Sequence, residues 1–143
     1  MTSGVDGGLA VLMVEDDPQQ ARLMAECLRR AGLGRRLGVH PDGETALRRL
    51  HEPGDGGRPD LVLLDLRLPG LGGDEVLAEI KSHPDLRRIP VVVISGSAEP
   101  ADVARAYALG ANCYVVKAPT FEGSLSLAIG IQQFWGGLAT LPP

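Results

Sequence analysis

The chain has 143 residues, of which 44% are hydrophobic, and its formal net charge is −4. This length suits one domain with a single packed core, and the acidic balance argues against general affinity for nucleic acid or an anionic membrane. No apolar run approaches the length of a membrane span, and the N-terminus lacks the order of a signal peptide. Cys27 and Cys113 have no neighbouring Cys or His, so we expect buried thiols in a reducing cytoplasm.

Short apolar runs alternate with amphipathic segments over residues 9–135. Residues 1–8 are expected to be a flexible leader, and residues 136–143 a short tail. Apolar runs predict strands, and apolar residues at helical spacing predict helices. The predicted strands are 9–14, 36–39, 61–64, 91–94 and 113–116, and the predicted helices are 18–31, 42–51, 74–81, 100–109 and 121–135. This alternation is typical of βαβ units, so we expect an α/β fold with a doubly wound, five-stranded parallel sheet and five helices.

The run at residues 61–64 is the central strand of this pattern. Its four consecutive apolar residues indicate a strand buried on both faces, and Asp65 follows it directly. Pro69 then prevents further pairing within a sheet. Because ligands of open α/β sheets bind outside the carboxyl ends of the strands, Asp65 is a candidate reactive group. A solvated or turn-forming Asp is the alternative from this stretch alone.

Polar residues also end three other predicted strands: Glu15 and Asp16 follow the first, Ser95 the fourth and Lys117 the fifth. These side chains should meet Asp65 at one edge of the sheet. Three carboxylates raise one another's pKa unless a cation neutralises them, and oxygen-only ligands favour Mg²⁺ or Mn²⁺ over zinc. A lysine and a hydroxyl beside them can pair with phosphoryl oxygens, so the set suits phosphoryl transfer.

Four motifs, in this order, resemble the receiver domain of two-component response regulators, which has the CheY-like, flavodoxin-like fold. They are VEDDP at 14–18, LDLRLP at 64–69 through Gly73, ISG at 94–96 and YVVK at 114–117. The resemblance covers residues 9–135 and implies the strand order 2-1-3-4-5. It also implies that the protein accepts a phosphoryl group from a histidine kinase and is not a free-standing enzyme. The only reaction that it could catalyse would be hydrolysis of its own aspartyl phosphate.

The resemblance assigns a role to each matching residue. Asp65 is the implied phosphoacceptor, and it holds Mg²⁺ (or Mn²⁺) together with Glu15, Asp16 and the backbone carbonyl of Arg67. The implied phosphate-binding and switch residues are Ser95 (the switch hydroxyl), Lys117 (the phosphate-pairing lysine) and Tyr114 (the aromatic whose rotamer follows the switch).

Further segments resemble free-standing receivers that partner bacterial phytochromes. These are EIK at 79–81, LRRIPV at 86–91, GANCY at 110–114 and a tail from Phe134-Trp135 to Leu141-Pro142. This similarity implies a phytochrome-type histidine kinase as the partner. No output domain is expected after the last helix, so signalling would act through altered protein–protein binding, without nucleic acid or membrane.

The chain departs from the receiver pattern at two positions. The family usually has a cis-linked Pro directly after the lysine, whereas here Ala118 separates Lys117 from Pro119. A cis bond before a residue other than Pro costs about 2.5–4 kcal/mol, so we expect a trans bond, with the Lys117 ammonium still reaching Asp65. Gly72 stands where the family often has an acidic residue, which would loosen that turn.

Three functions other than that of a phosphorylated receiver are alternatives for this chain. Haloacid-dehalogenase-type phosphatases, which are Mg²⁺-dependent, need a second Asp two residues after the first as the acid/base group. This chain has Arg67 at that position, and a guanidinium cannot release a proton. A nucleotide-binding doubly wound domain needs a Gly-rich first turn, where this chain has Glu-Asp-Asp-Pro, which would repel a phosphate unless a metal intervened. A degenerate receiver that only binds partners should lack an acid, the acceptor or the lysine, yet all are present; Ala118 keeps this alternative open.

On a helical wheel, the last predicted helix has two apolar stripes. The first, expected to pack on the sheet, contains Phe121, Leu125, Ala128, Ile129 and Trp135. The second, expected to be exposed, contains Leu127, Ile131 and Phe134. Exposed apolar surface usually marks an interaction site, so we expect a homodimer through this second stripe. The alternative is that the tail at residues 138–141 folds back over it.

Overall fold

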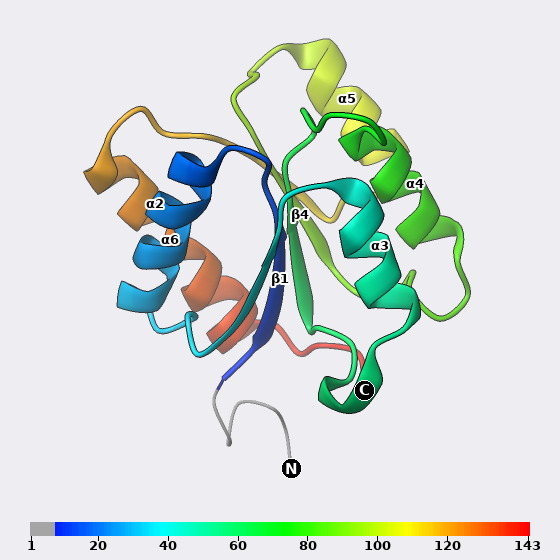
Figure 1. Ribbon diagram of the computed structural model, residues 1–143. Helices are drawn as coiled ribbons and strands as arrows, with labels where there is room; N and C mark the ends of the chain where they lie inside the picture. Colours follow the sequence, from blue (N-terminus) through cyan, green and yellow to red (C-terminus); the bar gives the residue numbers. More distant parts are fainter. Residues whose placement is uncertain (1–7) are drawn as a thin grey trace.

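The computed structural model describes residues 8–143 and shows a five-stranded parallel sheet with the order β2-β1-β3-β4-β5 (Figure 1). The strands are β1 (Ala10–Val14), β2 (Arg36–His40), β3 (Leu61–Leu64), β4 (Val91–Ser95) and β5 (Cys113–Val116). The helices are α2 (Pro18–Arg30), α3 (Gly43–His51), α4 (Gly73–Ser82), α5 (Pro100–Ala108) and α6 (Phe121–Gln133). The predicted fold class, strand order and five helices are therefore confirmed. The predicted leader falls almost wholly outside the described residues.

Helices cover both faces of the sheet: α2 and α6 lie on one face, and α3, α4 and α5 on the other (Figure 1). Because side chains alternate along a strand, β3 divides its residues between the two sides. Leu61 and Leu63 pack with α2 and α6, whereas Val62 and Leu64 pack with the opposite helices. All four are buried, as the continuous apolar run predicted. Within residues 8–143, no helix is long and apolar enough to cross a lipid bilayer.

The orientation of α6 corrects two assignments from the helical wheel. Ile131, placed on the exposed stripe, is only 5% exposed and packs in the core; Ile129, placed on the packed stripe, is 40% exposed. The buried face is defined by Ser124, Ala128 and Ile131, at positions i, i+4 and i+7 of the helix. The other members of the predicted packed stripe, Phe121, Leu125, Ala128 and Trp135, do pack in or against the core. Ser124 is polar and lies outside both apolar stripes, so the centre of the buried face is shifted from the predicted one toward Ile131.

The end of the chain also differs from the prediction. The predicted helix ends at residue 135, but a turn of π-helix, Phe134–Leu138, continues through Gly136 and Gly137. The tail then runs along the amino-terminal edge of the sheet (Figure 1), where Arg88 Nη1 donates a hydrogen bond to the Pro143 carbonyl at 3.3 Å. Leu138 is 79% exposed. Phe134 likewise remains 49% exposed, so the tail does not bury it.

Candidate functional site

The site forms because the backbone hydrogen bonds between neighbouring strands continue for one residue past the end of β3 and of β5. Val14 lies opposite Leu64 in the β1–β3 register, and the Asp65 N–H donates to the Val14 carbonyl at 3.1 Å. The Lys117 N–H donates in the same way to the Ser95 carbonyl at 2.7 Å. Residues distant in sequence thus begin their loops at one edge of the sheet, as predicted.

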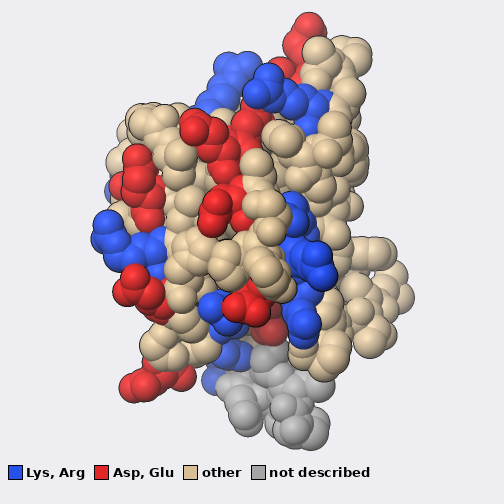
Figure 2. Space-filling model, turned by 90° about the vertical axis from the view of Figure 1, so that its right-hand side faces the viewer, with Lys and Arg blue, Asp and Glu red and all other residues tan. Residues whose placement is uncertain are grey.

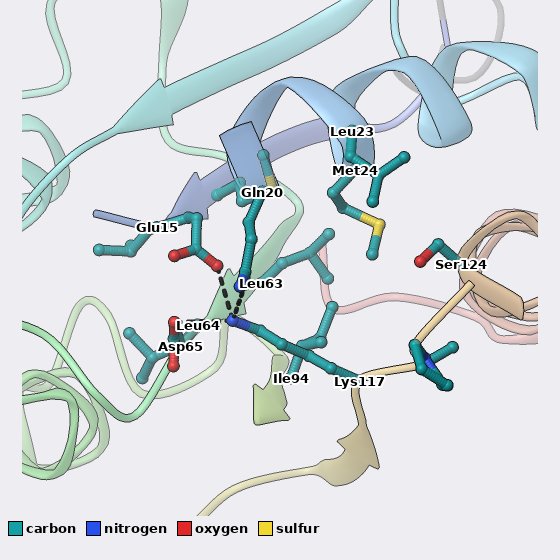
Figure 3. A pocket seen from close by; sticks show the side chains of 14 residues that line it. Glu15, Gln20, Leu23, Met24, Leu63, Leu64, Asp65, Ile94, Lys117 and Ser124 are labelled. Atoms are coloured by element: carbon teal, nitrogen blue, oxygen red, sulfur yellow. Dashed lines mark hydrogen bonds and ion pairs between the residues drawn. The ribbon is translucent and has the colours of Figure 1, made fainter. Parts of the chain in front are cut away.

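The Lys117 ammonium lies between the two buried carboxylates (Figure 3). Its Nζ donates to Glu15 Oε1 at 2.9 Å and to Asp65 Oδ2 at 3.0 Å. The predicted contact with Asp65 is therefore present despite the inserted Ala118. A third contact, to Gln20 Oε1 at 2.5 Å, was not predicted. A glutamine on an exposed helix surface has no sequence signature, so nothing in the pattern indicated this role.

Glu15, Asp16 and Asp65 each place a carboxylate oxygen within 4.8 Å of the others. Glu15 is 8% exposed and Asp65 6% exposed, whereas Asp16 is open to solvent. Burial raises the pKa of Glu15; the Asp65 charge adds to this, and hydrogen bonds from Lys117 and the Asp17 N–H only partly oppose it. Three crowded oxygen donors, one with a raised pKa, form a set that fits a hard divalent cation.

Lys117 is held in its charged form by the same carboxylates. Burial lowers its pKa, but hydrogen bonds and charges from Glu15 and Asp65 outweigh burial, and the pKa is raised above its ordinary value. The ammonium is therefore a permanent positive charge beside Asp65 at neutral pH. A point charge at this position can pair with a phosphoryl oxygen.

Short loops orient the two central acids. Asp17 caps α2 by accepting from the Gln19 N–H at 2.9 Å, and its own N–H donates to Glu15 Oε2 at 3.1 Å. Beyond β3, the Arg67 N–H donates to Asp65 Oδ1 at 3.0 Å. The remaining carboxylate oxygen, Oδ2, faces Lys117. The role expected for the Arg67 carbonyl in metal binding stays a prediction.

Ser95 and Tyr114 are linked through Ser97, which the sequence analysis did not single out. Ser95 is buried and its Oγ accepts from the Ser97 N–H at 3.1 Å, while the Tyr114 hydroxyl donates to the Ser97 carbonyl at 2.9 Å. Ser95 lines a small hollow beside the acceptor loop, together with Leu66, Arg67, Asp74, Asp102 and Arg105. The switch roles of Ser95 and Tyr114 stay predictions.

The loop with the inserted Ala118 has ordinary peptide geometry. No cis peptide bond occurs among residues 8–143, so the bond after Lys117 is trans, as expected. The loop passes close to the first turn of α6, where a Cβ added at Gly123 would lie 2.6 Å from the Ala118 Cβ. The absence of a side chain at Gly123 therefore makes room for the extra residue.

Comparisons with known proteins agree with this geometry. Residues 11–125 match the response regulator receiver domain family. The chain is 42% identical over 135 residues to the response regulator Rcp1 of Synechocystis sp., covering 92% of each chain. The phosphorylated cyanobacterial phytochrome response regulator RcpA has a crystal structure with a TM-score of 0.88 and 40% identity, covering 95% of this chain and 99% of its own. The Mn²⁺-bound form of Rcp1 gives a TM-score of 0.85 and 40% identity, covering 94% and 99%. The chain therefore belongs to the response regulator receiver domain family.

Proposed function

We propose that Asp65 accepts a phosphoryl group from a histidine kinase in a reaction that requires Mg²⁺ or Mn²⁺. The observation that carries the proposal is the Lys117 ammonium 3.0 Å from Asp65 Oδ2, beside the crowded carboxylates of Glu15 and Asp16. A nucleophilic carboxylate, a fixed positive charge and an oxygen-only ligand set are the components of phosphoryl transfer.

The transfer itself breaks the bond between phosphorus and the kinase histidine nitrogen and forms a bond between phosphorus and an Asp65 oxygen. Asp65 becomes an acyl phosphate, and the kinase histidine leaves as neutral imidazole, with the proton on the ring nitrogen that was not bonded to phosphorus. Lys117 keeps its proton throughout and moves one hydrogen bond from Asp65 Oδ2 to a phosphoryl oxygen. A cation bound by Glu15, Asp16 and Asp65 would neutralise the charge of the incoming phosphoryl group.

Incubation with acetyl phosphate and Mg²⁺ should raise the intact mass of the protein by one phosphoryl group. EDTA should prevent this change, and so should Asp65→Asn. Glu15→Ala and Asp16→Ala should each slow labelling at low Mg²⁺, because each removes a ligand. Equal labelling of Asp65→Asn would contradict the assignment, and an unlabelled wild type would favour a phosphorylation-independent binding module.

We further propose that the cognate kinase is of the bacterial phytochrome type and that both act in the cytoplasm. The similarity to Rcp1 and RcpA supports the first point, and the free cysteines suit a reducing compartment. Acidic and basic side chains are mixed on the visible face of α3, α4 and α5 (Figure 2), which suits a protein partner better than nucleic acid. Phosphotransfer from a purified phytochrome kinase should be faster than from an unrelated histidine kinase; equal rates would count against this partner.

We also propose a homodimer through α6 and the edge strand β5. An apolar groove of about 720 Å³ lies between them, and Leu127, Ile131 and Phe134 are among its lining residues. Because Ile131 is buried, the accessible part of this surface is Leu127 and Phe134, next to Val116 of the edge strand. An exposed apolar surface of this kind usually marks an interaction site.

Light scattering after size exclusion should give a dimer for the wild type and a folded monomer for Phe134→Glu. The control is Val39→Glu on β2, an equally exposed apolar residue at the opposite edge of the sheet, which should remain dimeric. A wild type that is monomeric at high micromolar concentration, with or without phosphorylation, would contradict the proposal.

A further inference from the structure

The Lys117 ammonium has three N–H donors, and the structure provides three acceptors for them. Two are carboxylate oxygens of the reaction centre, on Glu15 and Asp65. The third is the side-chain oxygen of Gln20, at 2.5 Å, from a residue 97 positions away on α2. An ammonium cannot accept a hydrogen bond, so Gln20 must present its carbonyl oxygen and not its amide nitrogen.

Gln20 is itself held in a defined place. It lies in the first turn of α2, where its N–H donates to the capping carboxylate of Asp17 at 3.4 Å. The Asp17 N–H in turn donates to Glu15 Oε2. The backbone of the residue that carries the third acceptor is therefore linked, through Asp17, to the carboxylate that carries the first.

The surroundings of Lys117 explain why a third acceptor matters. Its side chain is long and flexible, and it lines a cavity of about 280 Å³ together with Glu15, Gln20 and Asp65 (Figure 3). Beyond the carboxylates and Gln20, the lining is mostly apolar and includes Leu23, Met24, Ile94 and Pro119, and the only further polar side chain among the lining residues is Ser124. The three hydrogen bonds of the Lys117 Nζ are therefore the interactions that set the position of the ammonium in this cavity.

We propose that Gln20 is a positioning residue for the phosphoryl transfer proposed above, on which this inference rests. Gln20 forms no covalent bond in the reaction and acts only through Lys117. When Lys117 turns one donor from Asp65 to a phosphoryl oxygen, Glu15 and Gln20 retain the other two, so the ammonium pivots without leaving the site.

The test compares Gln20→Met with Gln19→Met. Methionine keeps the length and helix propensity of glutamine but lacks the strong acceptor. Gln19 is also exposed in the first turn of α2 and does not line the cavity, so it receives the same chemical change without the contact. At saturating Mg²⁺ and limiting acetyl phosphate, Gln20→Met should be labelled about three- to tenfold more slowly than wild type, as expected for the net loss of one solvent-exposed hydrogen bond. Gln19→Met should stay within about twofold.

Two further measurements separate positioning from other roles. Mn²⁺ affinity should be the same in all three proteins, because Gln20 supplies no oxygen to the carboxylate set. The Lys117 ammonium signal in ¹⁵N NMR, identified by its loss in Lys117→Ala, should exchange with water several-fold faster in Gln20→Met.

Unchanged labelling rate and ammonium exchange rate in Gln20→Met would overturn the proposal. An equally large decrease of the labelling rate in Gln19→Met would also overturn it, and so would an Mn²⁺ affinity that is weaker in Gln20→Met alone. A wild type that is not labelled on Asp65 would refute the proposed function instead. The NMR comparison would still show whether Gln20 holds Lys117.

Discussion

Gly123 in the first turn of α6 leaves the space that the loop with the extra Ala118 occupies. The substitution Gly123→Ala places a methyl group 2.6 Å from the Ala118 Cβ and 3.1 Å from Thr120 Oγ1. Carbon atoms in contact are normally about 3.5–4.0 Å apart, so the loop must move by roughly 1 Å. The cap itself can survive, because the Gly123 N–H that donates to Thr120 Oγ1 is retained.

Two opposing effects determine the size of the change. Replacing Gly by Ala inside a helix stabilises it by about 1 kcal/mol. Overpacking at a tight contact costs about 1–3 kcal/mol. The contact with Ala118 should prevail, giving a net loss of about 1 kcal/mol and a Tm lower by about 3–4 °C for a domain of this size.

The matched control is Gly130→Ala in the same helix, where an added Cβ has no neighbour within 4 Å. This variant should keep the helical gain and raise Tm by about 3 °C. Thermal and urea denaturation, followed by circular dichroism at low protein concentration, measure both. Ala118→Gly in the Gly123→Ala background should restore most of the lost stability. If Gly123→Ala is as stabilising as Gly130→Ala, or if Ala118→Gly restores nothing, the steric argument is wrong.

Two other predictions concern α6 and the acidic cluster. Ile131→Ala should lower the free energy of unfolding by about 2–4 kcal/mol, and Ile129→Ala by less than about 1 kcal/mol. Urea denaturation measures both, and equal losses in the two variants would contradict the observed packing of α6. Because burial and the nearby Asp65 raise the pKa of Glu15, the stability that this group contributes is present below its ordinary pKa of 4.5 and is lost as the pH rises through the raised value. Metal-free Glu15→Gln should therefore gain stability relative to wild type between acidic and neutral pH; a difference that does not vary with pH would contradict the raised pKa.

Much of the fold and the centre of the site could be predicted because they depend on local patterns. The apolar run at residues 61–64 indicates a strand buried on both faces, whatever packs against it. Alternation of strands and helices then restricts the sheet to parallel connections, and parallel strands bring their carboxyl ends to one edge. Glu15, Asp65 and Lys117 meet there because each directly follows a strand.

The remaining features depend on how the elements are placed against one another. A helical wheel gives the angles between residues but not the rotation of the helix on the sheet, which depends on the best-packed face. For α6 that face includes the polar Ser124, so Ile131 is buried and Ile129 exposed. The contact between Gln20 and Lys117 joins side chains that no local pattern relates, and it exists only because α2 lies beside the loop after β5. Sequence periodicity thus determined which elements form and where their polar ends meet, whereas packing in three dimensions decided which side chains complete the site.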